Sequence, residues 1–378
     1  MVISSTLHAA PPHSASCARV HTNTAAGPQQ LPCGYPGAVA DKAASPTEDS
    51  MSRLNLTYAC CTEAGLSDGR RKQSQDAWVV KEHVGGTQRV LLGVFDGHGE
   101  DGRGVADVVA MAMPKVVAAA LETVSEAELL EPTVSASVLT HAFGECSRLL
   151  PRIGALDLCL SGSTGVVAML DAHRLVVANL GDSKCVLGRV DSGGTGGGRG
   201  GAVAVEMTNE HTPGLVAEAA RVLSCGGRIA PYTLHGRPVG SLRVWLADHN
   251  VPGLSMTRCF GDAIAASVGV SDVPEVVEYA LAPGDRYLIL MSDGVSQFMG
   301  SSEIVEFVHH LASKRQMRPN KVAVELVREA RERWAKHHNG SADDCTCIVV
   351  FLEPLQHVGA ARKGARRGRM AAARACWR

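Results

Sequence analysis

Acidic residues at the ends of apolar runs are the main chemical signal in this 378-residue chain. Asp96, Asp182 and Asp293 each follow the last apolar residues of a run. Asp76 and Asp343 each stand just before the first apolar residues of a run. If the runs are strands of shared sheets, these carboxyl groups converge on one rim.

Converging carboxylates repel one another, so some of them stay protonated unless a cation is bound between them. Mg²⁺ and Mn²⁺ prefer oxygen ligands, such as carboxylate, carbonyl and water. A single Asp-Gly pair is typical of a turn, and that alternative stays open for each acid taken alone. Five acids placed alike favour a metal site.

Short apolar runs supply the strands that would position these acids. Residues 89–95 and 287–291 are almost entirely apolar, which is typical of strands buried on both faces. Residues 163–170 and 174–180 are separated by Asp171-Ala172-His173, which predicts a hairpin.

A change in the spacing of apolar residues, from strand-like to helix-like, predicts two helices. Asp101 is expected to cap a helix that carries Val105 and Val109, and Pro114 to kink or divide it. A second helix has one apolar face, with Glu329 and Arg333 as a supporting i,i+4 pair. That face holds Ala323, Val327, Ala330 and Trp334.

Composition divides the chain into a globular part and two ends. Residues 1–51 are rich in Ala, Ser, Thr and Pro and are predicted to be a disordered extension. Residues 355–378 hold seven basic side chains and no acid, which predicts a basic tail. Between them, residues 52–354 form the predicted domain, with a glycine-rich surface insertion at 192–201.

Several classes of protein are disfavoured. No apolar run approaches the roughly 20 residues that span a bilayer, and the chain lacks lipidation motifs at either end. Its twelve cysteines include no Cys-x-x-Cys spacing, which favours scattered reduced thiols. We expect a cytoplasmic monomer, with a nuclear location as the alternative.

The order and spacing of seven motifs resemble the PP2C family of metal-dependent protein serine/threonine phosphatases. The resemblance covers residues 54–353. The motifs are Ser74-Gln75-Asp76, Val94-Phe95-Asp96-Gly97-His98-Gly99, Gly162-Ser163-Thr164, Ala178-Asn179-Leu180-Gly181-Asp182-Ser183, Pro252 to Asp262, Ser292-Asp293-Gly294-Val295 and Asp343-Asp344-Cys345-Thr346.

This resemblance implies an α+β fold, a four-layer α-β-β-α sandwich of two antiparallel sheets flanked by antiparallel helices. It also implies a centre of two Mg²⁺ or Mn²⁺ ions. By this analogy Asp96 bridges both ions and the carbonyl of Gly97 ligates one, while Asp293 and Asp343 hold the other. Asp76 acts through metal-bound waters.

The resemblance also implies a reaction. A metal-bridging hydroxide attacks phosphoserine or phosphothreonine directly, and His98 protonates the departing oxygen. Arg71 occupies the place of the phosphate-binding arginine, although it also lies within a basic run with Arg70 and Lys72. Asp182 corresponds to an acid of a third metal site. Gln297 stands where an acid is usual, which puts that third ion in question.

Two rival functions remain open from the sequence. A pseudophosphatase would bind phosphoproteins without hydrolysing them, although the complete set of Asp96, Asp293 and Asp343 disfavours it. A metallohydrolase of small phosphate esters is the other rival. Phosphorylated proteins are the expected substrates, and the basic tail is expected to contact an acidic partner or to remain solvated.

Overall fold

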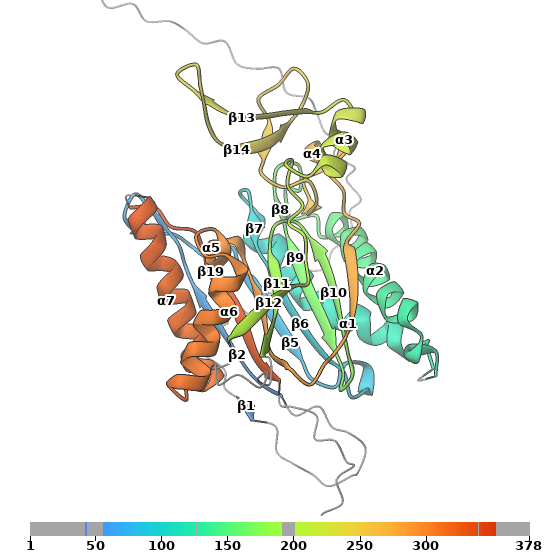
Figure 1. Ribbon diagram of the computed structural model, residues 1–378. Coiled ribbons are helices and arrows are strands. Elements are labelled where there is room, and N and C mark those ends of the chain that lie inside the picture. The colour runs from blue at the N-terminus through green and yellow to red at the C-terminus, as the bar shows by residue number, and fades with distance from the viewer. Residues whose placement is uncertain (1–41, 44–55, 126, 191–200, 339, 353–378) are drawn as a thin grey trace, which may run out of the picture. The chain divides into compact units, whose positions relative to one another are not determined.

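Two antiparallel sheets form the centre of the computed structural model, which describes residues 42–43, 56–125, 127–190, 201–338 and 340–352 (Figure 1). The six-stranded sheet has the order β1 (Lys42–Ala43), β2 (Leu56–Glu63), β19 (Cys345–Leu352), β18 (Asp285–Met291), β11 (Lys184–Val190) and β12 (Ala202–Glu206). The five-stranded sheet has the order β17 (Glu275–Ala280), β10 (Arg174–Leu180), β9 (Gly165–Leu170), β6 (Val90–Phe95) and β5 (Ala77–Lys81).

The facing sides of the two sheets share one apolar core. Leu92 and Val94 of β6 belong to it, together with Leu288 and Leu290 of β18. Alternate residues of the same strands point outward, so Leu91 and Ile289 lie in two other clusters beneath the helices. Burial of both faces explains the near-continuous apolar runs that predicted these strands.

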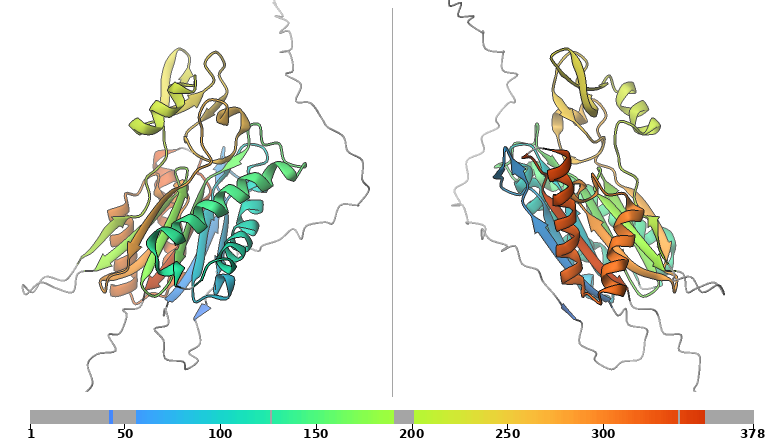
Figure 2. Two further views of the ribbon diagram at one scale, coloured as in Figure 1. Left: turned by 90° about the vertical axis from the view of Figure 1, so that its right-hand side faces the viewer. Right: turned by 60° about the vertical axis from the view of Figure 1, so that its left-hand side comes forward.

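Helices cover the outer face of each sheet, and Figure 2 shows the two layers from opposite sides. The helices α1 (Gly102–Glu122) and α2 (Pro132–Leu149) share a core cluster with the five-stranded sheet. On the six-stranded sheet lie α6 (Ser301–His309) and α7 (Pro319–His337). The four-layer sandwich expected from the sequence is confirmed.

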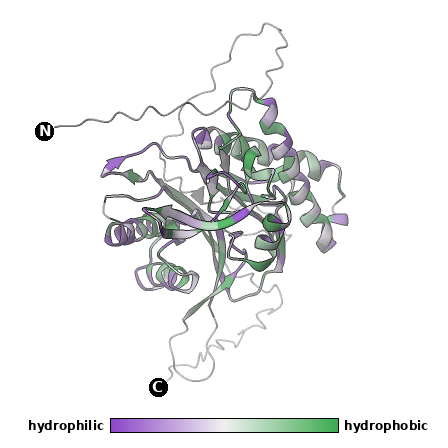
Figure 3. Cartoon of the chain, turned by 90° about the horizontal axis from the view of Figure 1, so that it is seen from above, coloured by the Kyte–Doolittle hydropathy of each residue, from purple (hydrophilic) through white to green (hydrophobic). Residues whose placement is uncertain are grey.

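Two predicted elements have the expected partners. Leu170 of β9 faces Leu175 of β10 across the hairpin turn. In α7, Ala323, Val327 and Ala330 are buried, and Glu329 bonds Arg333 at 3.0 Å. Hydrophilic and hydrophobic stretches alternate along the helices when the chain is viewed from above (Figure 3).

The start and middle of α1 differ from the prediction. The Asp101 side chain makes no cap hydrogen bond, because its Oδ2 accepts the N–H of Asp157 at 2.7 Å instead. Pro114 lies within the helix and does not divide it. The helix is also long and apolar enough to cross a membrane, although charged residues interrupt its apolar run. Its Val109, Met113 and Val117 pack in the core against the sheet.

A smaller lobe, absent from the predictions, follows the glycine-rich stretch. It contains α3 (Val216–Ser224), β13 (Arg228–Leu234), β14 (Arg237–Trp245), β15 (Pro252–Leu254) and α4 (Ala263–Ala266). These elements share a separate core that includes Val222, Val244, Met256 and Cys259.

Short elements complete the described chain. The strands are β3 (Leu66–Ser67), β4 (Arg70–Arg71), β7 (Gly97–His98), β8 (Gly162–Ser163) and β16 (Phe260–Gly261). The helical turns are α5 (Asp293–Ser296), η1 (Val84–Gly86), η2 (Glu128–Leu130), η3 (Leu150–Arg152) and η4 (His310–Lys314).

The predictions for the two ends and the insertion fall almost wholly outside the described residues. Within the predicted extension at 1–51, only Lys42–Ala43 are described, as β1 paired with Thr57 and Tyr58 of β2. Of the insertion at 192–201, only Gly201 is described. The basic tail at 355–378 lies outside.

Candidate active site

The five strand-end acids lie together at one end of the sandwich. Asp96 follows β6, Asp182 follows β10, and Asp293 opens α5 directly after β18. Asp76 and Asp343 stand before β5 and β19. The antiparallel order brings these strand ends to the same edge, because Ala77 pairs with Phe95 and Met291 with Cys347.

Burial and mutual repulsion disfavour the charged forms of these acids. Burial raises the pKa of Asp96 well above its usual value, and the charges of Asp76, Asp293, Asp343 and Asp182 raise it further. Burial and the neighbouring acids raise the pKa of Asp76 to about 7, of Asp293 to about 6 and of Asp182 to about 8. The cluster therefore favours a cation.

Two glycines next to Asp96 and Asp293 let neighbouring backbone segments approach closely. A Cβ atom on Gly97 would collide with the backbone of Gly102 and Gln75. A Cβ on Gly294 would collide with the carbonyl oxygen of Asp344. The backbone at both positions is therefore held in contacts that no other residue fits.

Asp76 lies deepest in the cluster and is only 2% exposed. Its Oδ2 accepts a hydrogen bond from Ser292 Oγ at 2.9 Å. Its Oδ1 is buried and has no hydrogen-bond partner among the described residues. A buried carboxylate oxygen without a partner is costly, and a water or an ion at this point would satisfy it.

Lys72 supplies a positive charge at the edge of the cluster. Its Nζ lies 2.7 Å from Asp343 Oδ1 and 3.2 Å from Asp344 Oδ2. Although burial acts to lower the pKa of Lys72, the bonds to these acids raise it above its usual value. Asp344 also accepts the N–H groups of Gly65 at 2.6 Å and Gln75 at 2.9 Å. It therefore joins three segments behind the acids.

His98 is held against a buried acid by the three-stranded sheet β7-β8-β16. Its Nε2 lies 2.5 Å from Oδ2 of Asp262, which also accepts a bond from Cys259 Sγ at 3.1 Å. Asp262 is 1% exposed. A Cβ on Gly162 of β8 would collide with both Asp262 Oδ2 and His98 Nε2. His98 therefore comes to the edge of the acid cluster with a fixed partner on one ring nitrogen.

Arg71 is not drawn into the cluster in this structure. Its guanidinium bonds Glu63 at 3.1 Å, and the side chain is 68% exposed. Its neighbour Lys72 contacts Asp343 instead. The phosphate-binding role of Arg71 stays a prediction, which requires the exposed side chain to turn from Glu63 toward the substrate.

Comparison with known proteins decides the family. A family model described as protein phosphatase 2C matches residues 63–339. The chain belongs to the PP2C family. One similar protein is the probable protein phosphatase 2C 72 of Arabidopsis thaliana, 34% identical over 75% of this chain and 83% of that protein. Another is the probable protein phosphatase 2C 64 of Oryza sativa subsp. japonica, 34% identical over 81% of this chain and 67% of that protein.

Solved structures support the same fold. The crystal structure of a serine-threonine phosphatase 2C from Toxoplasma gondii aligns over 84% of this chain and 99% of its own, with a TM-score of 0.66 and 22% identity. A C. elegans sex determining protein aligns over 82% of this chain and 67% of its own, with a TM-score of 0.61 and 20% identity. As a PP2C member, the chain is a protein serine/threonine phosphatase. The pseudophosphatase alternative has no support.

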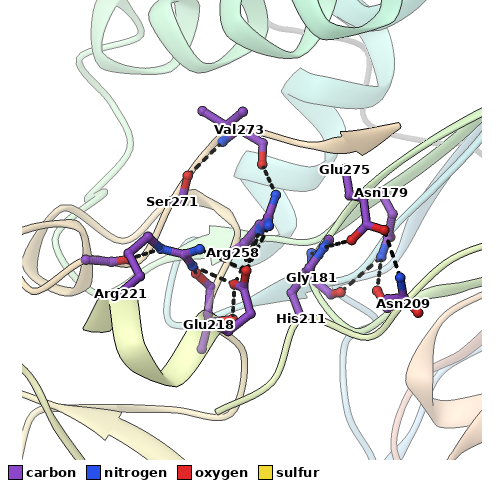
Figure 4. A network of polar contacts seen from close by, with 12 residues as sticks. Asn179, Gly181, Asn209, His211, Glu218, Arg221, Arg258, Ser271, Val273 and Glu275 are labelled. Atoms are coloured by element: carbon purple, nitrogen blue, oxygen red, sulfur yellow. Dashed lines mark hydrogen bonds and ion pairs between the residues drawn. The ribbon is translucent and has the colours of Figure 1, made fainter. Parts of the chain in front are cut away.

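One polar network of this PP2C chain supports the turn that carries Asp182 (Figure 4). The backbone N–H of Gly181 donates to Nδ1 of the buried His211 ring at 3.2 Å. The backbone N–H of His211 donates in turn to the Gly181 carbonyl at 2.9 Å. Glu275 lies 3.1 Å from the other ring nitrogen of His211. These bonds fix the backbone just before Asp182.

A second network joins α3 to the segment that leads to Asp262 (Figure 4). Glu218 is 3% exposed and accepts bonds from Arg221, from Arg258 at 2.8 Å and from Thr257 Oγ1 at 2.6 Å. Burial acts to raise the pKa of Glu218, but the bonds from Arg221, Arg258 and Thr257 hold it below its usual value. Glu218 therefore stays charged and ties α3 to the segment that precedes Asp262.

Sequence reasoning gave no role to several residues that build the site. Lys72 entered only as a neighbour of Arg71, and Asp344 only as part of a motif. Asp262 and Ser292 lay within quoted motifs without a function. Because Asp344 is adjacent to Asp343, the sequence could have indicated its place in the site. Lys72 and Asp343 are 271 residues apart, so the sequence carried no sign of their contact.

Proposed function

We propose that this PP2C phosphatase depends on Mg²⁺ or Mn²⁺ and hydrolyses phosphoserine and phosphothreonine in proteins at the acid cluster. The observation that carries the proposal is the cluster itself. Burial and mutual repulsion raise the pKa of Asp76, Asp96, Asp182 and Asp293, so bound cations would stabilise the ionised set. Asp96, Asp293 and Asp343 are also the residues that the family's motif order assigns to the two ions.

The donor set fits a hard divalent cation. Asp96 and the carbonyl of Gly97 would hold one ion, and Asp96, Asp293 and Asp343 the other. Asp76 would bond ion-bound water through its unpartnered Oδ1. Asp182 would contribute to a third ion, whose binding is expected to be weakened by Gln297 in place of the usual acid. We prefer Mn²⁺ or Mg²⁺ to softer metals because every donor in this set is oxygen.

When bound, such ions lower the pKa of water and neutralise charge on the phosphoryl group. The residues of the chain supply the other steps. His98 lies beside the acids and would donate a proton to the departing seryl or threonyl oxygen. Asp262 would orient the His98 ring and stabilise its protonated form, and Arg71 would pair with phosphoryl oxygens.

The deciding experiment measures phosphate release from a phosphothreonine peptide while Mg²⁺ or Mn²⁺ is titrated into the metal-free chain. We expect release to require the metal and to fall at least about 100-fold in Asp96→Asn and Asp293→Asn. Glu122→Gln, an exposed change at the end of α1, is the control and should match the wild type.

Two results would redirect the proposal. A chain that binds metal and phosphopeptide but releases no phosphate would be a binding module. A wide preference for free phosphate esters over every phosphopeptide tested would favour the small-substrate hydrolase.

A further inference from the structure

We propose that His98, Cys259 and Asp262 form a second metal site, which takes a borderline-soft divalent cation such as Zn²⁺ and blocks the phosphatase by occupying His98. One ligand atom from each residue lies within 4.8 Å of the other two. Sulfur, imidazole nitrogen and carboxylate oxygen together suit Zn²⁺, whereas the neighbouring cluster offers only oxygen. The two sites therefore select different ions.

Backbone pairing fixes where the three residues meet. His98 of β7 pairs with Gly162 of β8, and Gly261 of β16 pairs with the same glycine from its other side. Cys259 and Asp262 flank β16. One central strand therefore holds the histidine and the two other ligands in register, so the site does not depend on a flexible loop.

The distances require a small rearrangement for an ion to enter. His98 Nε2 and Cys259 Sγ lie 2.5 Å and 3.1 Å from Asp262 Oδ2. Ligands at the usual zinc distances in a tetrahedron lie about 3.5 Å from one another. Binding of an ion therefore requires side-chain rotation that separates the His98 and Asp262 atoms by about 1 Å. The ion then replaces their hydrogen bond as the link between them.

Ligation of the ion by Nε2 requires the ring proton of His98 to reside on Nδ1. Its Nδ1 is buried and has no hydrogen-bond partner among the described residues. With the proton on Nδ1, the lone pair of Nε2 points to the ion. The thiol of Cys259 also loses its proton to solvent when it ligates the ion. Burial and the charge of Asp262 raise the pKa of this thiol, so metal binding should strengthen as pH rises.

Burial shields two of the three ligands from solvent. Cys259 and Asp262 are 2% and 1% exposed, and the His98 side chain is 22% exposed. Because His98 is the most exposed of the three, an ion would enter beside it, where the substrate would also bind under the proposed function. Three protein ligands leave a fourth position for water. Ligation of His98 removes its ability to donate a proton, and this inhibitory consequence rests on the proposed role of His98.

Co²⁺ titration of the full reduced chain tests the site directly. Excess Mg²⁺ first fills the oxygen cluster, and Co²⁺ is then added while the near-ultraviolet thiolate-to-cobalt charge-transfer band is recorded. We expect one equivalent of Co²⁺ to produce the band and Zn²⁺ to remove it. Cys259→Ala should abolish it, whereas Cys225→Ala, a change at an exposed free cysteine, should retain it.

A second variant guards against misfolding. Asp262→Asn keeps the thiol and should weaken Co²⁺ binding at least about tenfold, with the melting temperature recorded for every variant. No band in the wild type, or a band of full strength in folded Cys259→Ala, would overturn the site.

Inhibition is measured separately. The Zn²⁺ concentration that halves each protein's own zinc-free rate should rise at least about tenfold in Cys259→Ala. Equal inhibition of both proteins would overturn the blocking role. A chain without phosphopeptide activity would count against the proposed function, while the cobalt band would still report on the site.

Discussion

The Nζ atom of Lys72 lies 2.7 Å from Oδ1 of Asp343, one of the acids expected to hold a metal ion. An ammonium group at this distance neutralises the carboxylate and repels an incoming cation. Lys72 would therefore compete with a metal ion that binds Asp343. Because the acid is 41% exposed, solvent screening limits the strength of this competition.

Replacing Lys72 with methionine should tighten metal binding. We expect the half-saturating Mn²⁺ concentration for phosphate release to fall about two- to fivefold in Lys72→Met, since an exposed ion pair contributes about 1 kcal/mol or less. Lys81→Met, a change at an exposed lysine of β5, serves as the control. Weaker Mn²⁺ binding in Lys72→Met would show that the lysine supports the site and does not compete for it.

The stability of the metal-free chain should fall as pH rises through the neutral range. The pKa values of Asp293, Asp76 and Asp182 are raised to about 6, about 7 and about 8 from 3.8. The folded state therefore binds more protons than the unfolded state between about pH 4 and pH 8, so the free energy of unfolding decreases over that window.

Thermal unfolding of the chelator-treated protein between pH 5.5 and pH 8.5 measures this effect. The melting temperature should fall toward high pH, and saturating Mn²⁺ should raise it most at the high-pH end. Asp96→Asn should flatten the slope in the absence of metal. A metal-free melting temperature that rises over this range would contradict the repulsion inferred for the cluster.

Asp262→Asn should slow the reaction according to the leaving group. Asparagine cannot stabilise protonated His98, so release from a phosphothreonine peptide should fall about tenfold or more. An aryl phosphate with an acidic phenol as leaving group needs little protonation and should lose much less. Equal losses on both substrates would mean that Asp262 only maintains structure.

Glu218→Gln should loosen the small lobe. Glutamine leaves Arg221 and Arg258 without their buried carboxylate. The loss is expected to lower the free energy of unfolding of the lobe by about 3 kcal/mol. Hydrogen exchange of the amides in Val216–Ser224 should therefore accelerate about 100-fold. Glu145→Gln, at an exposed pair with Arg148, should leave those amides unchanged. Unchanged hydrogen exchange in Glu218→Gln would show that the Glu218 network does not stabilise the lobe.

Local patterns were enough to predict the main elements. Burial on both faces left continuous apolar runs at β6 and β18, and a helical period marked the buried face of α7. The family resemblance then gave the four-layer order, which spacing alone did not. Asp101 shows the limit of local reasoning, because its side chain bonds Asp157 in a distant loop and does not cap its own helix.

The sequence by itself determined which acids stand at strand ends, because the polarity of neighbouring residues encodes that position locally. Only the tertiary structure decided which groups face those acids. Lys72 meets Asp343 across 271 residues, and His98 meets Asp262 across 164. Such partners depend on strand register and on how loops cross the sheet edge. Neither can be predicted from the residues that are neighbours along the chain.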